Sequence, residues 1–135
     1  MNPDHAQIQG VVERYLDGLY HCDTELLGSV FHPRALYATA VGPEPLFLSM
    51  DEYFPIVEKR DPPARTQAPR RERLISVELA GPVTAFVKLE CSFFQKDYID
   101  YLTLIRVDGR WQIIAKVFHY EPSPPEPAAT AATKG

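Results

Sequence analysis

Cysteine is scarce in this chain of 135 residues, which holds two, Cys22 and Cys91, far apart and outside any CxxC pair. That spacing indicates neither a disulfide framework nor a zinc site, so we expect reduced thiols. His21 and Asp23 flank Cys22 directly and are not spaced to converge on one metal ion. The chain also lacks a glycine-rich phosphate loop and a GxSxG nucleophile motif. We therefore expect no metal site and no cofactor.

Excess positive charge is absent as well. The net charge of -4 gives no basic surface for a phosphate backbone, which argues against nucleic acid as a partner. No apolar run approaches membrane-spanning length, and "MNPDHAQIQG" lacks the pattern of a signal peptide, so we expect a cytoplasmic protein without a membrane partner. The length and the 45% hydrophobic and 24% charged residues are typical of one globular domain.

Helical periodicity dominates the first third of the chain. Asn2 is a candidate cap and Pro3 a candidate first-turn residue for an amphipathic helix. A second, shorter helix is expected from Asp23 or Thr24 through "ELLGSVF", ending at the following His-Pro pair. The first helix is indicated by apolar residues at helical spacing, which are Ile8, Val12, Tyr15, Leu16 and Leu19.

Two short strands, "ALYATA" and "PLFL", are predicted around the turn "VGPEP". Ser49 and Glu52 then have capping-box spacing and open a third helix, which Pro55 should keep short or kinked. Residues 59–73 carry six Lys or Arg among three prolines and are predicted to form a long basic loop, either solvated or rimming a pocket. Residues 121–135, with four prolines and no aromatic residue, are predicted to be a disordered tail after a single domain at 1–120.

The pair Asp108-Gly109 between two apolar runs predicts a two-residue β-hairpin, because both residues tolerate the positive φ of a type I′ turn. An uninterrupted register from this turn makes Asp100 and His119 diagonal neighbours on one face, with Tyr98 beside them. That face is otherwise strongly apolar.

A second hairpin follows if Lys96-Asp97 form its turn, and a loop at "AGP" adds one more strand with Ile75 on the apolar face. The result is a four-stranded antiparallel meander with one face that a helix would bury. The opposite face carries more apolar residues than a face exposed to solvent usually does. In this register it includes Phe86, Phe94, Ile99, Tyr101, Ile105, Ile114, Lys116 and Phe118.

An acid and a base at the end of an apolar wall are what the floor of a concave site would look like. Asp100 and His119 are therefore the candidate catalytic residues. Two purely structural explanations stay open. Asp100 and His119 could both lie in water at the sheet edge, or they could form a buried pair with each other.

Several side chains could line the same cavity, although a tyrosine at helical spacing is more often a core residue. Cys91 likewise fits a small core residue better than a nucleophile. The candidate ligand-binding residues are Tyr15, Tyr20, His32, Tyr37, Tyr53, Cys91, Phe93, Tyr98 and Trp111.

The order of these elements resembles the nuclear transport factor 2-like superfamily, a cone-shaped, cystatin-like α+β fold. More narrowly, "YLDGLYHCDTELLGSVFHPRA", "LSMDEYF" and "DYLTLIRVDGRWQIIAKVFHY" resemble its putative lumazine-binding subgroup, over about residues 5–120. The resemblance implies N-terminal helices packed on a curved sheet, with a pocket at the wide end. Its members include ketosteroid isomerase-like and SnoaL-like enzymes as well as non-catalytic binding modules, so the fold does not choose the function.

Two functional hypotheses follow. One is a small-molecule binding domain or a cofactor-independent acid–base enzyme of isomerase, dehydratase or cyclase type, with a partly apolar pocket for an aromatic or polycyclic ligand. The other is a non-catalytic dimerisation or accessory domain with a vestigial cavity. In both cases the apolar outer sheet face predicts a homodimer.

Overall fold

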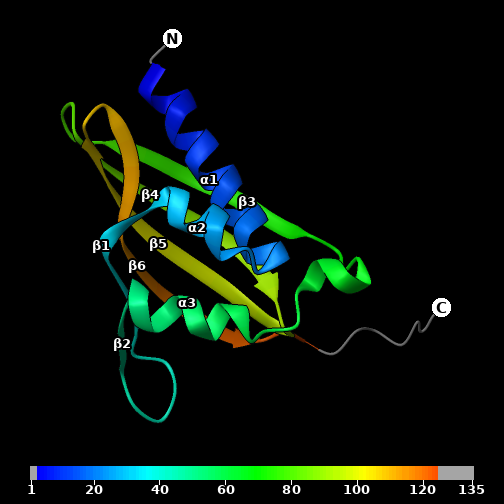
Figure 1. The fold of residues 1–135 in the computed structure, drawn as a ribbon. Helices are drawn as coiled ribbons and strands as arrows, with labels where there is room; N and C mark the ends of the chain where they lie inside the picture. Colours follow the sequence, from blue (N-terminus) through cyan, green and yellow to red (C-terminus); the bar gives the residue numbers. More distant parts are fainter. Residues whose placement is uncertain (1–2, 125–135) are drawn as a thin grey trace.

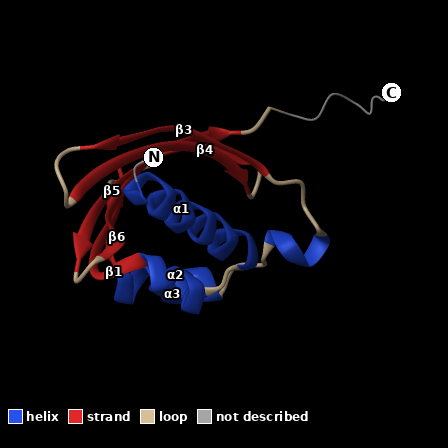
Figure 2. Cartoon of the chain, turned by 90° about the horizontal axis from the view of Figure 1, so that it is seen from above, coloured by secondary structure: helices blue, strands red, loops and turns tan. Residues whose placement is uncertain are grey.

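The computed structural model describes residues 3–124, which form three α-helices lying against the concave face of one curved sheet (Figures 1 and 2). This arrangement confirms the predicted α+β fold class. In chain order the elements are α1 (Pro3–His21), α2 (Thr24–Val30), β1 (Phe31–Thr39), β2 (Leu46–Ser49), α3 (Met50–Glu58), the 3₁₀ helix η1 (Pro63–Thr66), β3 (Arg71–Leu79), β4 (Thr84–Phe93), β5 (Lys96–Val107) and β6 (Arg110–Pro122).

The helix ends follow local capping chemistry. The Asp23 carboxylate accepts a hydrogen bond from the Leu26 amide at 3.0 Å and caps α2. The predicted capping box of α3 is confirmed, with the Ser49 and Glu52 side chains each bonded to the other's backbone amide. Helix α2 ends at Val30, before the predicted His-Pro stop, because the chain is already extended at the next residue and β1 begins there. The proposed cap Asn2 lies outside the described residues.

The sheet has six strands in the order β2-β1-β6-β5-β4-β3. Its second half is the predicted antiparallel meander of β3, β4, β5 and β6. The short hairpin of β1 and β2 extends it, because β1 pairs in parallel with β6. Sequence alone gave no sign of this pairing, since the two strands are more than seventy residues apart. The parallel pairing lets one sheet wrap around the helices (Figure 2).

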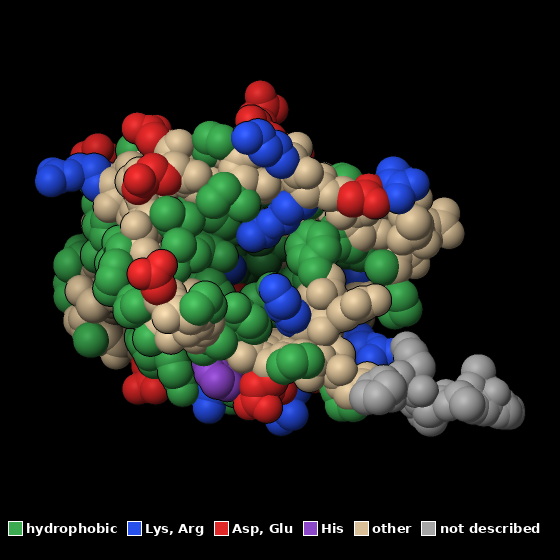
Figure 3. Space-filling view, turned by 90° about the horizontal axis from the view of Figure 1, so that it is seen from below, with side chains coloured by type: hydrophobic (Ala, Val, Ile, Leu, Met, Phe, Trp, Pro, Cys, Tyr) green, Lys and Arg blue, Asp and Glu red, His purple; other side chains and the backbone are tan. Residues whose placement is uncertain are grey.

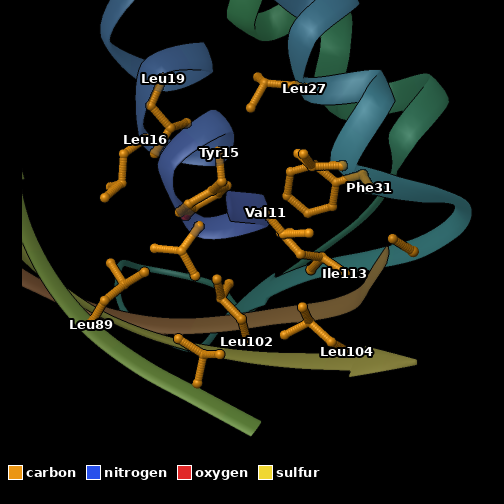
Figure 4. Close-up of a cluster of buried hydrophobic side chains, with 14 of the residues drawn as sticks. Val11, Tyr15, Leu16, Leu19, Leu27, Phe31, Leu89, Leu102, Leu104 and Ile113 are labelled. Carbon is orange, nitrogen blue, oxygen red and sulfur yellow. The ribbon is translucent and has the colours of Figure 1, made fainter. Parts of the chain in front are cut away.

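The core lies between α1 and the concave face of the sheet. In the close-up, Tyr15 and Val11 of α1 point toward Leu102 of β5 and Ile113 of β6, and Phe31 closes the space below α2 (Figure 4). The Tyr15 and Phe31 rings meet edge to face, with centroids 5.9 Å apart. The amphipathic helix predicted from the first twenty residues therefore covers the apolar face predicted from the meander.

The β4–β5 turn differs from the prediction. Phe94 and Gln95, both with positive φ, form the turn in place of Lys96-Asp97. The shift moves each pairing partner by four residues, so Leu89 lies opposite Asp100 instead of Leu104. An even shift keeps every side chain on its predicted face, and Asp100 accordingly still points inward.

The β5–β6 hairpin turns at Asp108-Gly109 as predicted, and the predicted register holds as far as Leu104 opposite Ile113. A bulge at Ile114 then adds one residue to β6, so Asp100 pairs with Phe118 and not with Val117. A shift by one residue exchanges the faces to which all later side chains of β6 point. Lys116 and Phe118, predicted on the outer face, therefore lie inside the fold.

Three further expectations need correction. A register shift between Leu74 and Ser76 leaves Ile75 exposed instead of on the apolar face. The basic segment 59–73 is not one loop, since it contains η1 and the start of β3. The predicted tail begins inside β6, which runs to Pro122 because Lys96 pairs with that residue, and the tail beyond residue 124 lies outside the described residues.

The helices among residues 3–124 are all too short or too polar to cross a membrane.

Candidate functional site

Asp100 lies fully buried on β5, beneath α1. The Tyr15 hydroxyl donates a hydrogen bond to its Oδ2 atom at 2.5 Å, and the Lys116 ammonium lies 3.9 Å from the same oxygen. The other oxygen, Oδ1, is buried and has no hydrogen-bond partner among residues 3–124. A buried carboxylate with one unused oxygen has a lone pair available to accept a proton or a ligand hydrogen bond.

Lys116 on β6 is the cation of this pair and is 4% exposed. Its ammonium lies 5.2 Å from the ring centroids of Tyr15 and Tyr37 and 5.0 Å from that of Phe118, distances typical of cation–π contacts. Burial by itself would lower the pKa of Lys116, but Asp100 and the neighbouring tyrosines outweigh it and raise that pKa. The side chain is therefore an ammonium ion at neutral pH.

A small cavity opens above Lys116 at the wide end of the cone. Its volume is about 20 Å³, enough for about one water molecule. Figure 3 views a face of the molecule with a hollow bordered by hydrophobic side chains and by Lys or Arg side chains. The cavity is lined by Leu19, Tyr37, Arg60, Cys91, Phe93, Phe94, Tyr98 and Lys116.

Two larger hollows, of about 610 and 780 Å³, lie near the β4–β5 turn and the end of β6. Both are open depressions that reach Pro124, the last described residue. Neither is lined by Lys116, so we place the site at the smaller cavity, which Lys116 and Arg60 both line and behind which Asp100 lies.

Arg60 stands at the mouth of this cavity, just beyond the end of α3. Its guanidinium carbon lies 5.7 Å from the Tyr53 ring centroid and 5.5 Å from that of Phe94. Burial would lower the pKa of Arg60, but the hydroxyls of Tyr53 and Tyr37 more than offset this effect and raise it. The cavity thus has one cation at its floor and a second at its mouth.

The remaining polar groups near the cavity are neutral at physiological pH. Burial is the main cause that raises the pKa of the Cys91 thiol, and the adjacent Asp100 carboxylate adds to it, so Cys91 is a poor nucleophile. Burial also raises the pKa of Tyr53, and it raises that of Tyr98 to about 12. These tyrosines keep their hydroxyl protons and act as hydrogen-bond donors.

His119 is not part of this site. The bulge at Ile114 turns it to the outer face of the sheet, where its side chain is 54% exposed and Nε2 lies 3.0 Å from Glu121 Oε2. The predicted contact between Asp100 and His119 is therefore wrong, and Lys116 takes the place next to Asp100.

The structure divides the other predicted site residues into three groups. Tyr37, Cys91, Phe93 and Tyr98 line the cavity, while Tyr15 and Tyr53 lie behind its wall, bonded to Asp100 and stacked on Tyr37 respectively. Three lie elsewhere: the Tyr20 hydroxyl bonds the Ala68 carbonyl, His32 Nδ1 accepts from the Arg34 amide, and Trp111 donates to Asp4.

Lys116 and Arg60 are the functional candidates that sequence reasoning missed. The sequence gives no signal for Lys116, because the predicted register placed it on the outer face, where a lysine is expected, and only the bulge at Ile114 turns it inward. Arg60 belongs to the basic segment that the sequence left as either solvated or rimming a pocket, and nothing in that segment distinguishes Arg60 from its five other cations.

The arrangement combines three chemical abilities. Asp100 can accept a proton, Lys116 can stabilise a nearby negative charge, and the tyrosine hydroxyls can orient a ligand oxygen. Within the described residues, no three His, Cys, Asp or Glu side chains gather closely enough to hold a metal ion.

Comparison with known proteins places this chain in a family. The model of a family described as "Putative lumazine-binding" matches residues 3–119. The aldolase FrzH of a Cladobotryum species is 44% identical over 43 residues, which cover 30% of this chain and 34% of that protein. The match thus spans about a third of the length of that curated relative.

Solved structures show the same fold. An NTF2-like protein of unknown function from Shewanella baltica OS155 has a TM-score of 0.79 and 18% identity, covering 90% of this chain and 96% of its own. One from Silicibacter pomeroyi DSS-3 has a TM-score of 0.78 and 22% identity, covering 90% and 100%. A ketosteroid isomerase-like protein from Erwinia carotovora atroseptica SCRI1043 has a TM-score of 0.72 and 14% identity, covering 92% and 100%. At these identities the likeness concerns the fold alone.

Proposed function

This chain belongs to the "Putative lumazine-binding" family of the nuclear transport factor 2-like superfamily, and we propose that it is a cofactor-independent enzyme that removes a proton next to a carbonyl group of a small molecule. The observation that carries the proposal is the buried ion pair of Asp100 and Lys116 beneath a cavity with tyrosine hydroxyls. Burying two charges is costly, so a pair in the wall of a cavity is a candidate for function.

In the proposed reaction, the Asp100 carboxylate accepts the proton from the carbon next to the carbonyl. The electron pair of the broken C–H bond forms the double bond of an enolate, whose negative oxygen lies against the Lys116 ammonium. Asp100 then returns the proton to another carbon, or the enolate carbon attacks a second carbonyl carbon, whose oxygen becomes an alkoxide and takes the proton back from Asp100. Asp100 lies behind the cavity wall, so the substrate carbon has to enter the space beside Lys116.

Lys116 acts here as a cation and not as a nucleophile. A lysine that forms a Schiff base needs a neutral amine, whereas Asp100 and the tyrosines raise the pKa of Lys116. The same reasoning assigns no nucleophilic role to the Cys91 thiol, whose pKa is raised by burial.

Two similar proteins support the proposal of enolate chemistry. One relative is an aldolase and one structural neighbour is ketosteroid isomerase-like. Both an aldol reaction and a keto isomerisation begin with removal of a proton next to a carbonyl. The family description names lumazine, but the proposed reaction does not involve it.

Solvent exchange tests the proposal without a known substrate. A panel of simple ketones and β-dicarbonyl compounds is incubated with the protein in D₂O, and loss of the α-proton signal is followed by ¹H NMR. We expect exchange faster than in buffer for at least one compound, and a loss of about 10²–10⁴-fold in Asp100→Asn, the usual contribution of a general base.

His119→Gln is the matched control, because it also replaces an acid–base side chain by an amide but lies on the outer face. It should exchange at the wild-type rate. The proposal fails if no compound on the panel exchanges faster than in buffer, or if folded Asp100→Asn keeps the wild-type rate.

The small cavity favours a second candidate, a non-catalytic domain in which the ion pair only holds the core together. In that case the panel shows no exchange, and Asp100→Asn lowers stability alone.

We also propose that the protein is a homodimer, with a cytoplasmic location. The outer sheet face carries a row of partners across four strands, Phe47, Ala38, Val117 and Tyr101, and the Tyr101 ring stacks on Phe86 at 5.5 Å. No helix among the described residues covers this face (Figure 2). A second copy placed on this face would bury it.

Tyr101→Glu should make the protein monomeric, because it places a charge on that face, at the end of the row and beside Phe86. Sedimentation velocity at micromolar concentration measures the change. Ile56→Glu on α3 is the control, since Ile56 is 44% exposed, as Tyr101 is at 40%, but lies on another surface. A monomeric wild-type protein would exclude the dimer.

A further inference from the structure

The cavity at the wide end of the cone has an imbalance of charge that indicates the kind of molecule it takes. Two cations line it, Lys116 at the floor and Arg60 at the mouth, while Asp100 lies behind the wall. Lys116 pairs with Asp100. Within residues 3–124, Arg60 makes no ion pair with an Asp or Glu side chain, and its guanidinium faces the rings of Tyr53 and Phe94.

The hydrogen-bonding capacity of both cations exceeds what the protein uses. The 3.9 Å between Lys116 Nζ and Asp100 Oδ2 is an ion pair and too long for a hydrogen bond, so the ammonium can donate to a ligand. A guanidinium has five N–H donors in a planar fork that matches a carboxylate, and the Tyr37 hydroxyl and the aromatic faces leave some of them free for a ligand. The buried Tyr53 hydroxyl also has no hydrogen-bond partner among the described residues.

We propose that the substrate is a small oxo acid, whose carboxylate binds Arg60 while its carbonyl oxygen lies against the Lys116 ammonium. The two cations line one cavity, so a single short molecule reaches both. Leu19, Phe93 and Phe94 contribute apolar walls that suit a short hydrocarbon segment between the two polar groups. The proposal rests on the proposed function for the role of Lys116 and adds the class of substrate.

Arg60 also limits access to the cavity. The space of about 20 Å³ is smaller than any oxo acid, and the Arg60 side chain lies between the Tyr53 and Phe94 rings at its mouth. Binding therefore requires the guanidinium to leave the aromatic rings. A ligand carboxylate compensates for this movement, because its bidentate contact with the guanidinium replaces the cation–π contacts that Arg60 loses.

Matched probes test this inference by calorimetric titration. Acetoacetate has both the carboxylate and the carbonyl, methyl acetoacetate keeps the carbonyl without the charge, and butyrate keeps the charge without the carbonyl. We expect acetoacetate to bind at least tenfold more tightly than methyl acetoacetate, with butyrate intermediate. Equal affinity for acetoacetate and its ester, or binding of neither, overturns the inference.

Arg60→Gln should remove the preference for the charged probe, so that acetoacetate binds no more tightly than methyl acetoacetate. Arg65→Gln is the control, because Arg65 is in the same segment but is exposed and paired with Asp61 at 2.5 Å. A charge preference that survives in Arg60→Gln also overturns the inference.

The two proposals fail separately. Preferred binding of acetoacetate without proton exchange on any carbonyl compound contradicts the proposed function and keeps the inferred ligand class. Exchange on neutral β-dicarbonyl compounds without a preference for acetoacetate supports the proposed function and contradicts the inferred ligand class.

Discussion

Replacing Lys116 by Met is expected to lower the free energy of unfolding by about 3–5 kcal/mol, the usual cost of leaving a buried charge without its partner. Methionine keeps an unbranched chain of similar length, so the change removes the ammonium and little of the packing. Asp100 would remain fully buried, with the Tyr15 hydroxyl and the Cys91 thiol as its nearest polar neighbours. Denaturant unfolding at neutral pH measures the loss.

A second substitution separates charge from packing. The double variant Asp100→Asn with Lys116→Met has neither charge, and it should be more stable than Lys116→Met alone. Lys96→Met is the control, because the Lys96 ammonium also lies over an aromatic ring, 4.8 Å from the Tyr120 centroid, at the protein surface. It should change stability by about 0.5 kcal/mol or less. A double variant less stable than both single variants would show that the two charges do not depend on each other.

Stability should also fall steeply at alkaline pH. Burial raises the pKa of the Cys91 thiol and of the hydroxyls of Tyr15, Tyr53 and Tyr98 in the folded protein, and Asp100 with the tyrosines raises that of Lys116. Each of these groups holds its proton more tightly when folded than when unfolded. The unfolded state then releases protons first as the pH rises, so the free energy of unfolding decreases.

The expected pH range follows from the unfolded pKa values, which are about 8.5 for Cys and about 10 for Tyr and Lys. The stability that these five buried, protonated side chains contribute should be fully present below about pH 8 and decline between about pH 9 and pH 11. Urea unfolding at a series of pH values measures the decline, and Tyr15→Phe should make it shallower because one titrating group is gone. A free energy of unfolding that stays constant to about pH 11 would contradict these shifts.

The buried tyrosines connect this stability to the candidate site. Tyr37 stacks on Tyr53 with ring centroids 4.1 Å apart, and Lys116 and Arg60 each lie over one of these rings. Each of the two cations thus lies over one ring of the same stacked pair. The buried residues that stabilise the fold here are also the ones that would position a ligand. Such an overlap is a common source of a trade-off between stability and activity.

Sequence alone determined the elements and most of their faces. Helical spacing, the capping box at Ser49 and the Asp108-Gly109 turn are local patterns, in which one or two residues fix the backbone over a few positions. The face of Asp100 was also predicted correctly although its turn was not, because strands alternate with a period of two and the turn was displaced by an even number of residues.

Only the tertiary structure decided the partner of Asp100 and the members of the site. The bulge at Ile114 leaves no local signal, yet one extra residue places His119 in solvent and Lys116 beside Asp100. Arg60 reaches the cavity because α3 ends there, and β1 brings Tyr37 to it through a parallel pairing with β6. These contacts join segments far apart in the chain, and they depend on how the whole sheet curves around α1, which no short stretch of sequence specifies.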